Sequence, residues 1–109
     1  MDIKHITDTV SVTGQICPND IETIVGLGFR SIICNRPDGE EAGQATFETV
    51  AKAADAAGLP INYVPISHMG LTAENVGAFQ EALANLPTPI LAYCRSGARS
   101  AMCYSMAAE

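Results

Sequence analysis

The fold is decided by residues 91–100, Leu-Ala-Tyr-Cys-Arg-Ser-Gly-Ala-Arg-Ser. An apolar run ends in Cys94, a loop of small residues with two arginines follows, and a segment compatible with a helix comes next. This order predicts a strand, an anion-binding loop and a helix N-terminus. A cysteine attacks as its thiolate, which is favoured beside arginines, backbone N–H groups and the positive end of a helix dipole. Cys94 is therefore the candidate nucleophile.

Segments typical of strands and helices alternate before this loop. Strands are expected as two short pieces within residues 3–14, at residues 31–34 and at residues 61–66. Helices are expected from Pro18 to Gly26 or Gly28, over residues 44–57, and after Thr72 as the N-cap. This alternation predicts an α/β fold with a mostly parallel central sheet flanked by helices.

Composition limits the class of protein. The 109 residues are enough for one domain with a single core, and a hydrophobic fraction of 48% with mean hydropathy +0.17 indicates a globular chain. A net charge of −6 argues against nucleic acid or an anionic membrane as partner. No apolar run approaches the roughly 20 residues of a membrane span. We expect one domain over residues 1–109. The sequence ends about three turns into the helix after the loop, which suggests that this domain is cut from a longer protein.

The four cysteines, at positions 17, 34, 94 and 103, contain no C-x-x-C pair, and the first residues lack the apolar core of a signal peptide. Reduced thiols and a cytoplasmic location are expected. The spacings of cysteine and histidine match no common metal site, so neither a metal nor another cofactor is expected.

The loop from Cys94 to Ser100 resembles the active-site loop of rhodanese sulfurtransferases, which has Cys, two residues, Gly, one residue and Arg. The cysteine-phosphatase loop is similar but places five residues between Cys and Arg, where this chain has four. Ser100 stands where the phosphatase arginine would fall, and Tyr93 stands where phosphatases usually have His.

Nearly the whole chain resembles the phosphatase-like domain of bacterial β-lactamase hydrolase-like proteins. Besides the loop, the matching pieces are residues 12–15, 35–41 and 63–66. The resemblance implies a cysteine-phosphatase-like or rhodanese-like fold that carries a rhodanese-type loop. It also favours a functional role for the turn-rich segment 35–41, in which Arg36 would bind an anionic substrate and Asp38 or Glu40 would hold an arginine. Alternatively, Arg36 is a solvent-exposed loop residue without a role in binding.

The loop type implies a sulfurtransferase. Cys94 would carry sulfane sulfur as a persulfide from thiosulfate or a low-molecular-weight persulfide to a thiol acceptor, with Arg99 as the second catalytic residue. The substrate would be bound by the loop amides and side chains of Arg95, Ser96, Gly97, Ala98 and Ser100, together with Arg36. Residues 67–75 contain no aspartate for the general acid that dual-specificity phosphatases use, and sulfur transfer needs none because its leaving group is already a stable anion.

Two other functions stay open. One is a cysteine-dependent phosphatase, a hydrolase. The other is a non-catalytic sulfur relay for a partner or fused metallo-β-lactamase-like persulfide dioxygenase, which the family resemblance connects with sulfide detoxification. Two side chains also have two interpretations each: His68 is either an exposed residue or a proton donor, and Cys103 is either packed, as its neighbours Met102 and Met106 suggest, or a resolving thiol. Cys34 is expected in the core, and Cys17 as a packed or incidental thiol.

Overall fold

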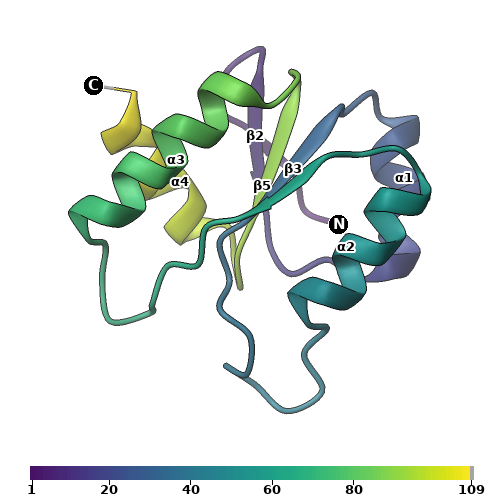
Figure 1. Ribbon diagram of the computed structural model, residues 1–109, viewed down its shortest axis with the longest axis horizontal. Helices are drawn as coiled ribbons and strands as arrows, with labels where there is room; N and C mark the ends of the chain where they lie inside the picture. The colour runs from purple at the N-terminus through teal and green to yellow at the C-terminus, as the bar shows by residue number, and fades with distance from the viewer. Residues whose placement is uncertain (109) are drawn as a thin grey trace.

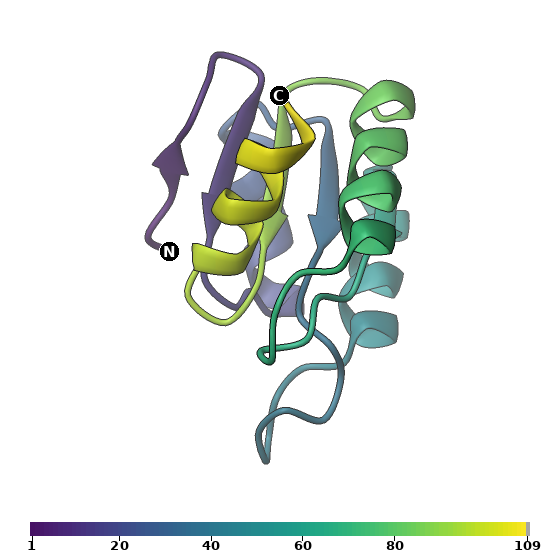
Figure 2. The same cartoon turned by 90° about the vertical axis from the view of Figure 1, so that its left-hand side faces the viewer.

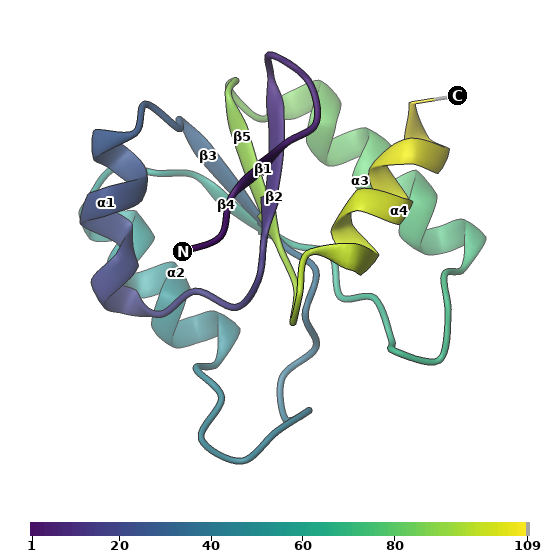
Figure 3. The ribbon, with the colours of Figure 1, turned by 180° about the vertical axis from the view of Figure 1, so that it is seen from behind.

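A computed structural model describes residues 1–108 and contains one five-stranded sheet with the order β1-β2-β5-β3-β4. The strands are β1 Lys4–His5, β2 Val10–Thr13, β3 Ser31–Cys34, β4 Ile61–Tyr63 and β5 Ile90–Tyr93. The short β1 lies antiparallel to β2 at the sheet edge, and all other pairs are parallel (Figure 3). The predicted mostly parallel sheet is confirmed.

Helices cover both faces of the sheet. A 3₁₀ turn, Pro18–Asp20, leads into α1 Ile21–Gly26, and the longer helices are α2 Phe47–Ala56, α3 Ala73–Asn85 and α4 Ala98–Ala107. The helices α1 and α2 lie on one face, and α3 and α4 lie on the other (Figure 1). Each face has its own buried cluster of apolar side chains, one beneath α1 and α2 and the other beneath α3 and α4. The predicted α/β architecture is therefore correct.

The strand β5 lies at the centre of the sheet, between β2 and β3, and all four of its residues are buried. Tyr93 pairs with Thr13 of β2 and with Cys34 of β3, so three strands end at the same level. The loops that follow β3, β4 and β5 project from this one end of the sheet (Figure 2). Ligands of open α/β sheets gather at the carboxyl ends of the strands, and Cys94 follows the central one.

Two element boundaries differ from the sequence prediction. The helix α2 begins at Phe47 and not at residue 44, because the Thr46 side chain caps it by accepting a hydrogen bond from the Thr49 N–H at 3.2 Å. Gln44 instead braces the preceding loop, where its side chain donates to the Pro37 carbonyl at 2.9 Å. The strand β4 ends at Tyr63 and not at residue 66, although the backbone continues to follow the segment after β3.

Within residues 1–108, no helix has the length and apolar character needed to cross a membrane. The predicted cytoplasmic location stays a prediction.

Candidate active site

The loop after β5 turns directly into α4 through Gly97. This glycine is the N-cap of the helix and has a φ of 94°, a left-handed conformation that L side chains rarely adopt. A Cβ at this position would also lie 3.4 Å from the backbone of Thr13. The glycine thus allows the loop to fold its amides inward, as the sequence predicted.

Cys94 lies at the base of this loop, with 1% of its surface exposed. The Gly97 N–H donates to its Sγ at 3.0 Å. Burial raises the pKa of the Cys94 thiol, but hydrogen bonds to the sulfur from the backbone N–H groups of Ser100, Ser96, Arg99 and Gly97 outweigh it and lower the pKa below its ordinary value. The sulfur is therefore held in an environment that favours the thiolate.

The segment after β2 holds the loop from behind. The Cys94 N–H donates to the Thr13 carbonyl at 3.3 Å, and the Gln15 N–H donates to the Arg95 carbonyl at the same distance. A Cβ on Gly14 would lie only 3.0 Å from the Arg95 carbonyl oxygen. This close approach gives a physical reason for the Thr-Gly-Gln sequence at residues 13–15.

Arg99 reaches across the site from the first turn of α4. Its Nη1 donates to Glu40 Oε2 at 2.8 Å and to the Ile66 carbonyl at 2.7 Å, and its Nη2 donates to Glu40 Oε1 at 2.8 Å. A guanidinium has five N–H donors, and among residues 1–108 the Nε–H and the second Nη2–H, which share one edge, bind no oxygen atom. Hydrogen bonding to Glu40 raises the pKa of Arg99, and Cys94 contributes in the same direction, which places Arg99 beside the thiolate. Arg99 can offer this free edge to an anion.

Glu40 connects the charged groups around the site. Its Oε1 accepts from Arg36 Nε at 3.0 Å as well as from Arg99, and its Oε2 lies 3.8 Å from His68 Nδ1. The hydrogen bond from Arg99, assisted by Arg36, lowers the pKa of Glu40 to about 2, against a burial effect that raises it. The expectation that Glu40 or Asp38 holds an arginine is confirmed for Glu40. Asp38 instead accepts from the Phe47 N–H at 2.8 Å.

Arg36 is buried, with 3% of its surface exposed, so the solvated interpretation is wrong. Its three guanidinium nitrogens each donate to a side chain: Nε to Glu40, Nη1 to Gln15 at 3.1 Å and Nη2 to Glu41 at 3.2 Å. Arg36 lines a hollow that also contains Cys17, separate from the one between Arg95 and Arg99. Its position supports a structural role behind Glu40, and direct contact with substrate stays a prediction.

A hollow of about 560 Å³ opens on the Arg99 side of the loop. It is lined by Pro37, Gly39, Glu40, Ser67, His68, Arg95 and Arg99. Among residues 1–108, the Arg95 side chain forms no hydrogen bond or ion pair, and His68 is 73% exposed. The hollow therefore presents one unpaired arginine, one arginine edge and one imidazole near Cys94.

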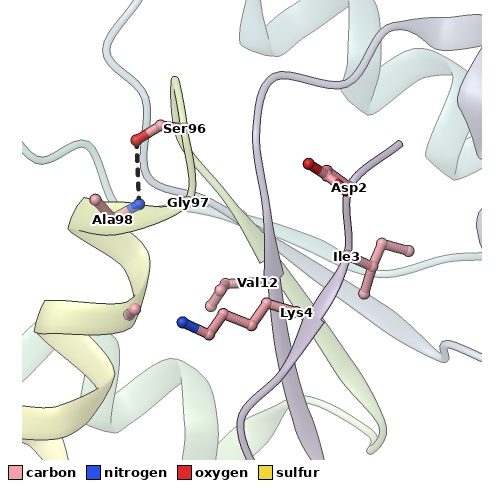
Figure 4. Close-up of a pocket in the computed structure, with 8 residues that line it drawn as sticks. Asp2, Ile3, Lys4, Val12, Ser96, Gly97 and Ala98 are labelled. Carbon is pink, nitrogen blue, oxygen red and sulfur yellow. Dashed lines mark hydrogen bonds between the residues drawn. The ribbon is translucent and has the colours of Figure 1, made fainter.

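A second hollow, of about 470 Å³, lies on the other side of the loop, where Ser96, Gly97 and Ala98 face Lys4 of β1 (Figure 4). The Ser96 hydroxyl accepts from the Ala98 N–H at 3.3 Å, as the dashed line in Figure 4 shows. This bond occupies the Ala98 N–H within the loop, and a role for Ala98 in substrate binding stays a prediction. The loop thus separates two hollows: Arg95 lines the first, and Ser96, Gly97 and Ala98 line the second. Ser100 is completely buried and lines neither, so its predicted contact with substrate stays a prediction.

Asn35 belongs to the segment 35–41 that the resemblance marked as functional, but the sequence predicted no role for this residue. Asn35 follows β3 and is completely buried, and its Oδ1 accepts from the Ser100 hydroxyl at 2.8 Å. An asparagine directly after an apolar strand is a signal in the sequence, because a buried polar side chain needs a hydrogen-bond partner. Only the fold shows that this partner is Ser100.

The other three thiols differ in environment. Burial raises the pKa of Cys34, and it raises the pKa of Cys103 to about 11. Cys34 lies in the core, as predicted, whereas Cys17 is exposed and its thiol donates a hydrogen bond to the Asp20 carboxylate at 3.3 Å. Cys103 is completely buried in the apolar cluster beneath α3 and α4, which fits the packed interpretation, although Met102 and Met106 themselves are 58% and 46% exposed. Among residues 1–108, no group of three His, Cys, Asp or Glu side chains is placed to hold a metal ion.

Sequence relatives cover almost the whole chain. The model of the family "Beta-lactamase hydrolase-like protein, phosphatase-like domain" matches residues 2–109. Two curated relatives are identical to this chain at about a third of the aligned positions. The Beta-lactamase hydrolase-like protein of Xylella fastidiosa (strain Temecula1) is 36% identical over 106 residues, and that of Agrobacterium fabrum (strain C58) is 35% identical over 104 residues. These stretches are 97% and 95% of this chain but only 25% and 24% of the relatives, so the chain spans about a quarter of their length.

Solved structures show the same fold. A candidate phosphatase from Neisseria meningitidis Z2491 is similar with a TM-score of 0.87 and 30% identity, over 95% of this chain and 74% of that one. The core catalytic domain of the PP-IP phosphatase Siw14 from S. cerevisiae has a TM-score of 0.65 and 14% identity, over 96% of this chain and 72% of that one. P. aeruginosa TpbA has a TM-score of 0.63 and 11% identity, over 87% of this chain and 54% of that one. The last two likenesses show the fold alone. The family match over residues 2–109 establishes that the chain belongs to the phosphatase-like domain family of the beta-lactamase hydrolase-like proteins.

Proposed function

We propose that this domain is a cysteine-dependent, phosphatase-like enzyme in which the Cys94 thiolate attacks a small anionic substrate. The single observation that carries the proposal is the set of backbone N–H groups that converge on the Cys94 sulfur, with the Gly97 N–H at 3.0 Å. A buried thiol without such donors would have a raised pKa, as Cys34 and Cys103 have. Arg95 and the free edge of Arg99 would bind the anion in the adjoining hollow.

The comparisons support phosphoester hydrolysis better than the sulfur transfer that the loop resemblance implied. In this reaction the thiolate attacks phosphorus, the phosphorus–oxygen bond breaks, and the leaving oxygen takes a proton. Water then hydrolyses the phosphocysteine and restores the thiolate. His68, which lines the same hollow, is the available proton donor, because Glu40 is held ionised by Arg99.

Sulfur transfer is the second candidate, and a specific observation favours it. The loop has four residues between Cys94 and Arg99, and residues 67–75 contain no aspartate. The thiolate would attack the sulfane sulfur of thiosulfate, the sulfur–sulfur bond would break, and sulfite would leave with the electron pair. An acceptor thiolate would then take the outer sulfur from the Cys94 persulfide and release the Cys94 thiolate. The comparisons give this reaction no support of their own.

The proposed partners depend on this choice. A persulfide dioxygenase, fused or separate, and a role in sulfide detoxification belong to the sulfur-transfer reaction alone. The relatives are about four times as long as this chain, which leaves room for a further domain in them.

Two parallel activity assays distinguish the two reactions. The reduced domain is incubated with an aryl phosphate in one series and with thiosulfate plus cyanide in another, each beside Cys94→Ser. Phosphate release that the variant loses supports hydrolysis, and thiocyanate formation that the variant loses supports sulfur transfer. Turnover that survives in Cys94→Ser contradicts both candidates.

A further inference from the structure

A buried polar bridge joins the end of β3 to the first turn of α4. The Ser100 hydroxyl donates to Asn35 Oδ1 at 2.8 Å, and neither residue is exposed to solvent. A buried hydrogen bond of this kind is costly to break, because each partner is left without water to replace the other. The bridge therefore fixes where the first turn of α4 lies relative to the sheet.

Asn35 is itself fixed by two neighbouring segments, β5 and the segment after β4. Its Nδ2 donates to the Val64 carbonyl at 2.8 Å, and its backbone N–H donates to the Tyr93 carbonyl at 2.7 Å. Its own carbonyl accepts from the Ile66 N–H at 2.9 Å. Asn35 thus joins β5 and the segment after β4 at the level where the Cys94 loop begins.

Ser100 uses its two polar groups on different partners. Its backbone N–H is among the donors to the Cys94 sulfur, while its hydroxyl points to Asn35. We propose that Asn35 is a positioning residue for the active site, which holds Ser100 through its hydroxyl so that the Ser100 N–H points at the Cys94 sulfur. The proposal rests on the assignment of Cys94 as the nucleophile.

The physical reason is the directionality of the hydrogen bond. An N–H donor weakens steeply when it is turned away from its acceptor, and a thiolate that loses a donor takes up a proton more readily. Release of the Ser100 hydroxyl would allow the first turn of α4 to shift, and the thiolate would then form at higher pH. The titratable or charged groups that face Cys94 are Arg99 of α4 and Cys34 of β3, and both stay in the variants below.

The readout is the ultraviolet absorbance of the thiolate as a function of pH. It is recorded on the whole domain in a Cys17→Ser background, because Cys17 is exposed, and the curve of the matching Cys94→Ser protein is subtracted. In Ser100→Ala we expect the midpoint of the Cys94 titration to rise by about half a pH unit to one unit. Asn35→Ala is expected to give the same rise, and the double variant no more than either, because the two residues act through one bond.

Ser31→Ala is the matched control. The Ser31 hydroxyl is equally buried and donates to the Pro87 carbonyl at 2.7 Å, but it lies at the opposite end of β3. Both serine variants lose one buried hydrogen bond and should unfold at a lower temperature, yet only Ser100→Ala should move the titration. Equal midpoints in the two variants, or additive shifts in the double variant, would overturn the proposal.

The titration does not require turnover, and its central comparison does not require an Asn35 variant that folds. Ser100→Ala against Ser31→Ala decides the proposal if Asn35→Ala does not fold. A domain without activity on either substrate would contradict the proposed function, but it would leave the titration result as it stands.

Discussion

Glu40 holds Arg99 with two hydrogen bonds of 2.8 Å, one to each carboxylate oxygen. This paired contact occupies one edge of the guanidinium and directs the Nε edge away from Glu40. The same carboxylate accepts from the buried Arg36, so one arginine from the loop after β3 and one from the first turn of α4 meet on one acid. The geometry makes Glu40 the group that orients Arg99.

Replacement of Glu40 by Gln should therefore reduce activity without removing the nucleophile. An amide keeps the shape but loses the charge and one acceptor, so Arg99 is released and kcat/KM falls by about tenfold to a hundredfold. Steady-state kinetics on the active substrate measure the change. Glu48→Gln is the control, because Glu48 is 80% exposed and pairs only with Lys52 at 3.7 Å. Equal activity in the two variants would contradict the role of Glu40.

The acid stability of the domain should depend on the same carboxylate. The pKa of Glu40 is about 2 in the folded protein, against an ordinary value of 4.5 for a glutamate, so the folded state favours the ionised form. The stabilisation is present above pH 4.5 and is lost as the pH falls toward 2. Thermal unfolding curves should show a steeper loss of stability over this range for the wild type than for Glu40→Gln. An equal loss of stability in the wild type and in Glu40→Gln would contradict a stabilising ion pair between Glu40 and Arg99.

Arg99 and Arg95 should differ in their tolerance of lysine. Arg99 uses three N–H donors on Glu40 and Ile66, an arrangement that a lysine ammonium cannot reproduce while it also contacts substrate. Arg99→Lys should lower kcat/KM by about a hundredfold, and Arg95→Lys by less than about tenfold because a point charge suffices there. Kinetics on both variants provide the comparison. A reversed order would show that Arg95 is the principal anion ligand.

Gly14 tests the fit of the loop against the segment after β2. In Gly14→Ala the new Cβ would lie 3.0 Å from the Arg95 carbonyl oxygen, so the loop must shift and the Gly97 donor moves with it. Activity and melting temperature should both fall.

Gly26→Ala is the matched control for this change. Gly26 lies in α1 with nothing within 4 Å of its Cβ position, so alanine should stabilise the domain by about 0.5–1 kcal/mol and leave activity unchanged. If Gly14→Ala behaved like Gly26→Ala, the close approach would have no effect on the loop.

The sequence predicted the fold because the pattern of residues was local and consistent. The apolar runs at residues 31–34 and 90–93 are buried on both faces of a parallel sheet, and Thr72 caps α3 as expected. The loop glycine was also readable, since Gly97 adopts the left-handed conformation that the turn requires.

The polar contacts across the site were less accessible from the sequence. Arg36 seemed free to bind an anion or to lie in solvent, whereas it is buried against Glu40, a contact between neighbouring loop residues that the turn geometry decides. The bridge from Asn35 to Ser100 joins residues 65 positions apart, and no local pattern records it.

The central claim is that Cys94 forms a covalent bond with the transferred group, and intact mass spectrometry of the reduced domain tests it most directly. The protein is mixed briefly with thiosulfate or with an aryl phosphate, quenched, and compared with Cys94→Ser. We predict an added sulfur atom or an added phosphoryl group that maps to Cys94 and is missing from the variant. An adduct of equal amount on Cys94→Ser, or turnover without any Cys94 adduct, would contradict the account.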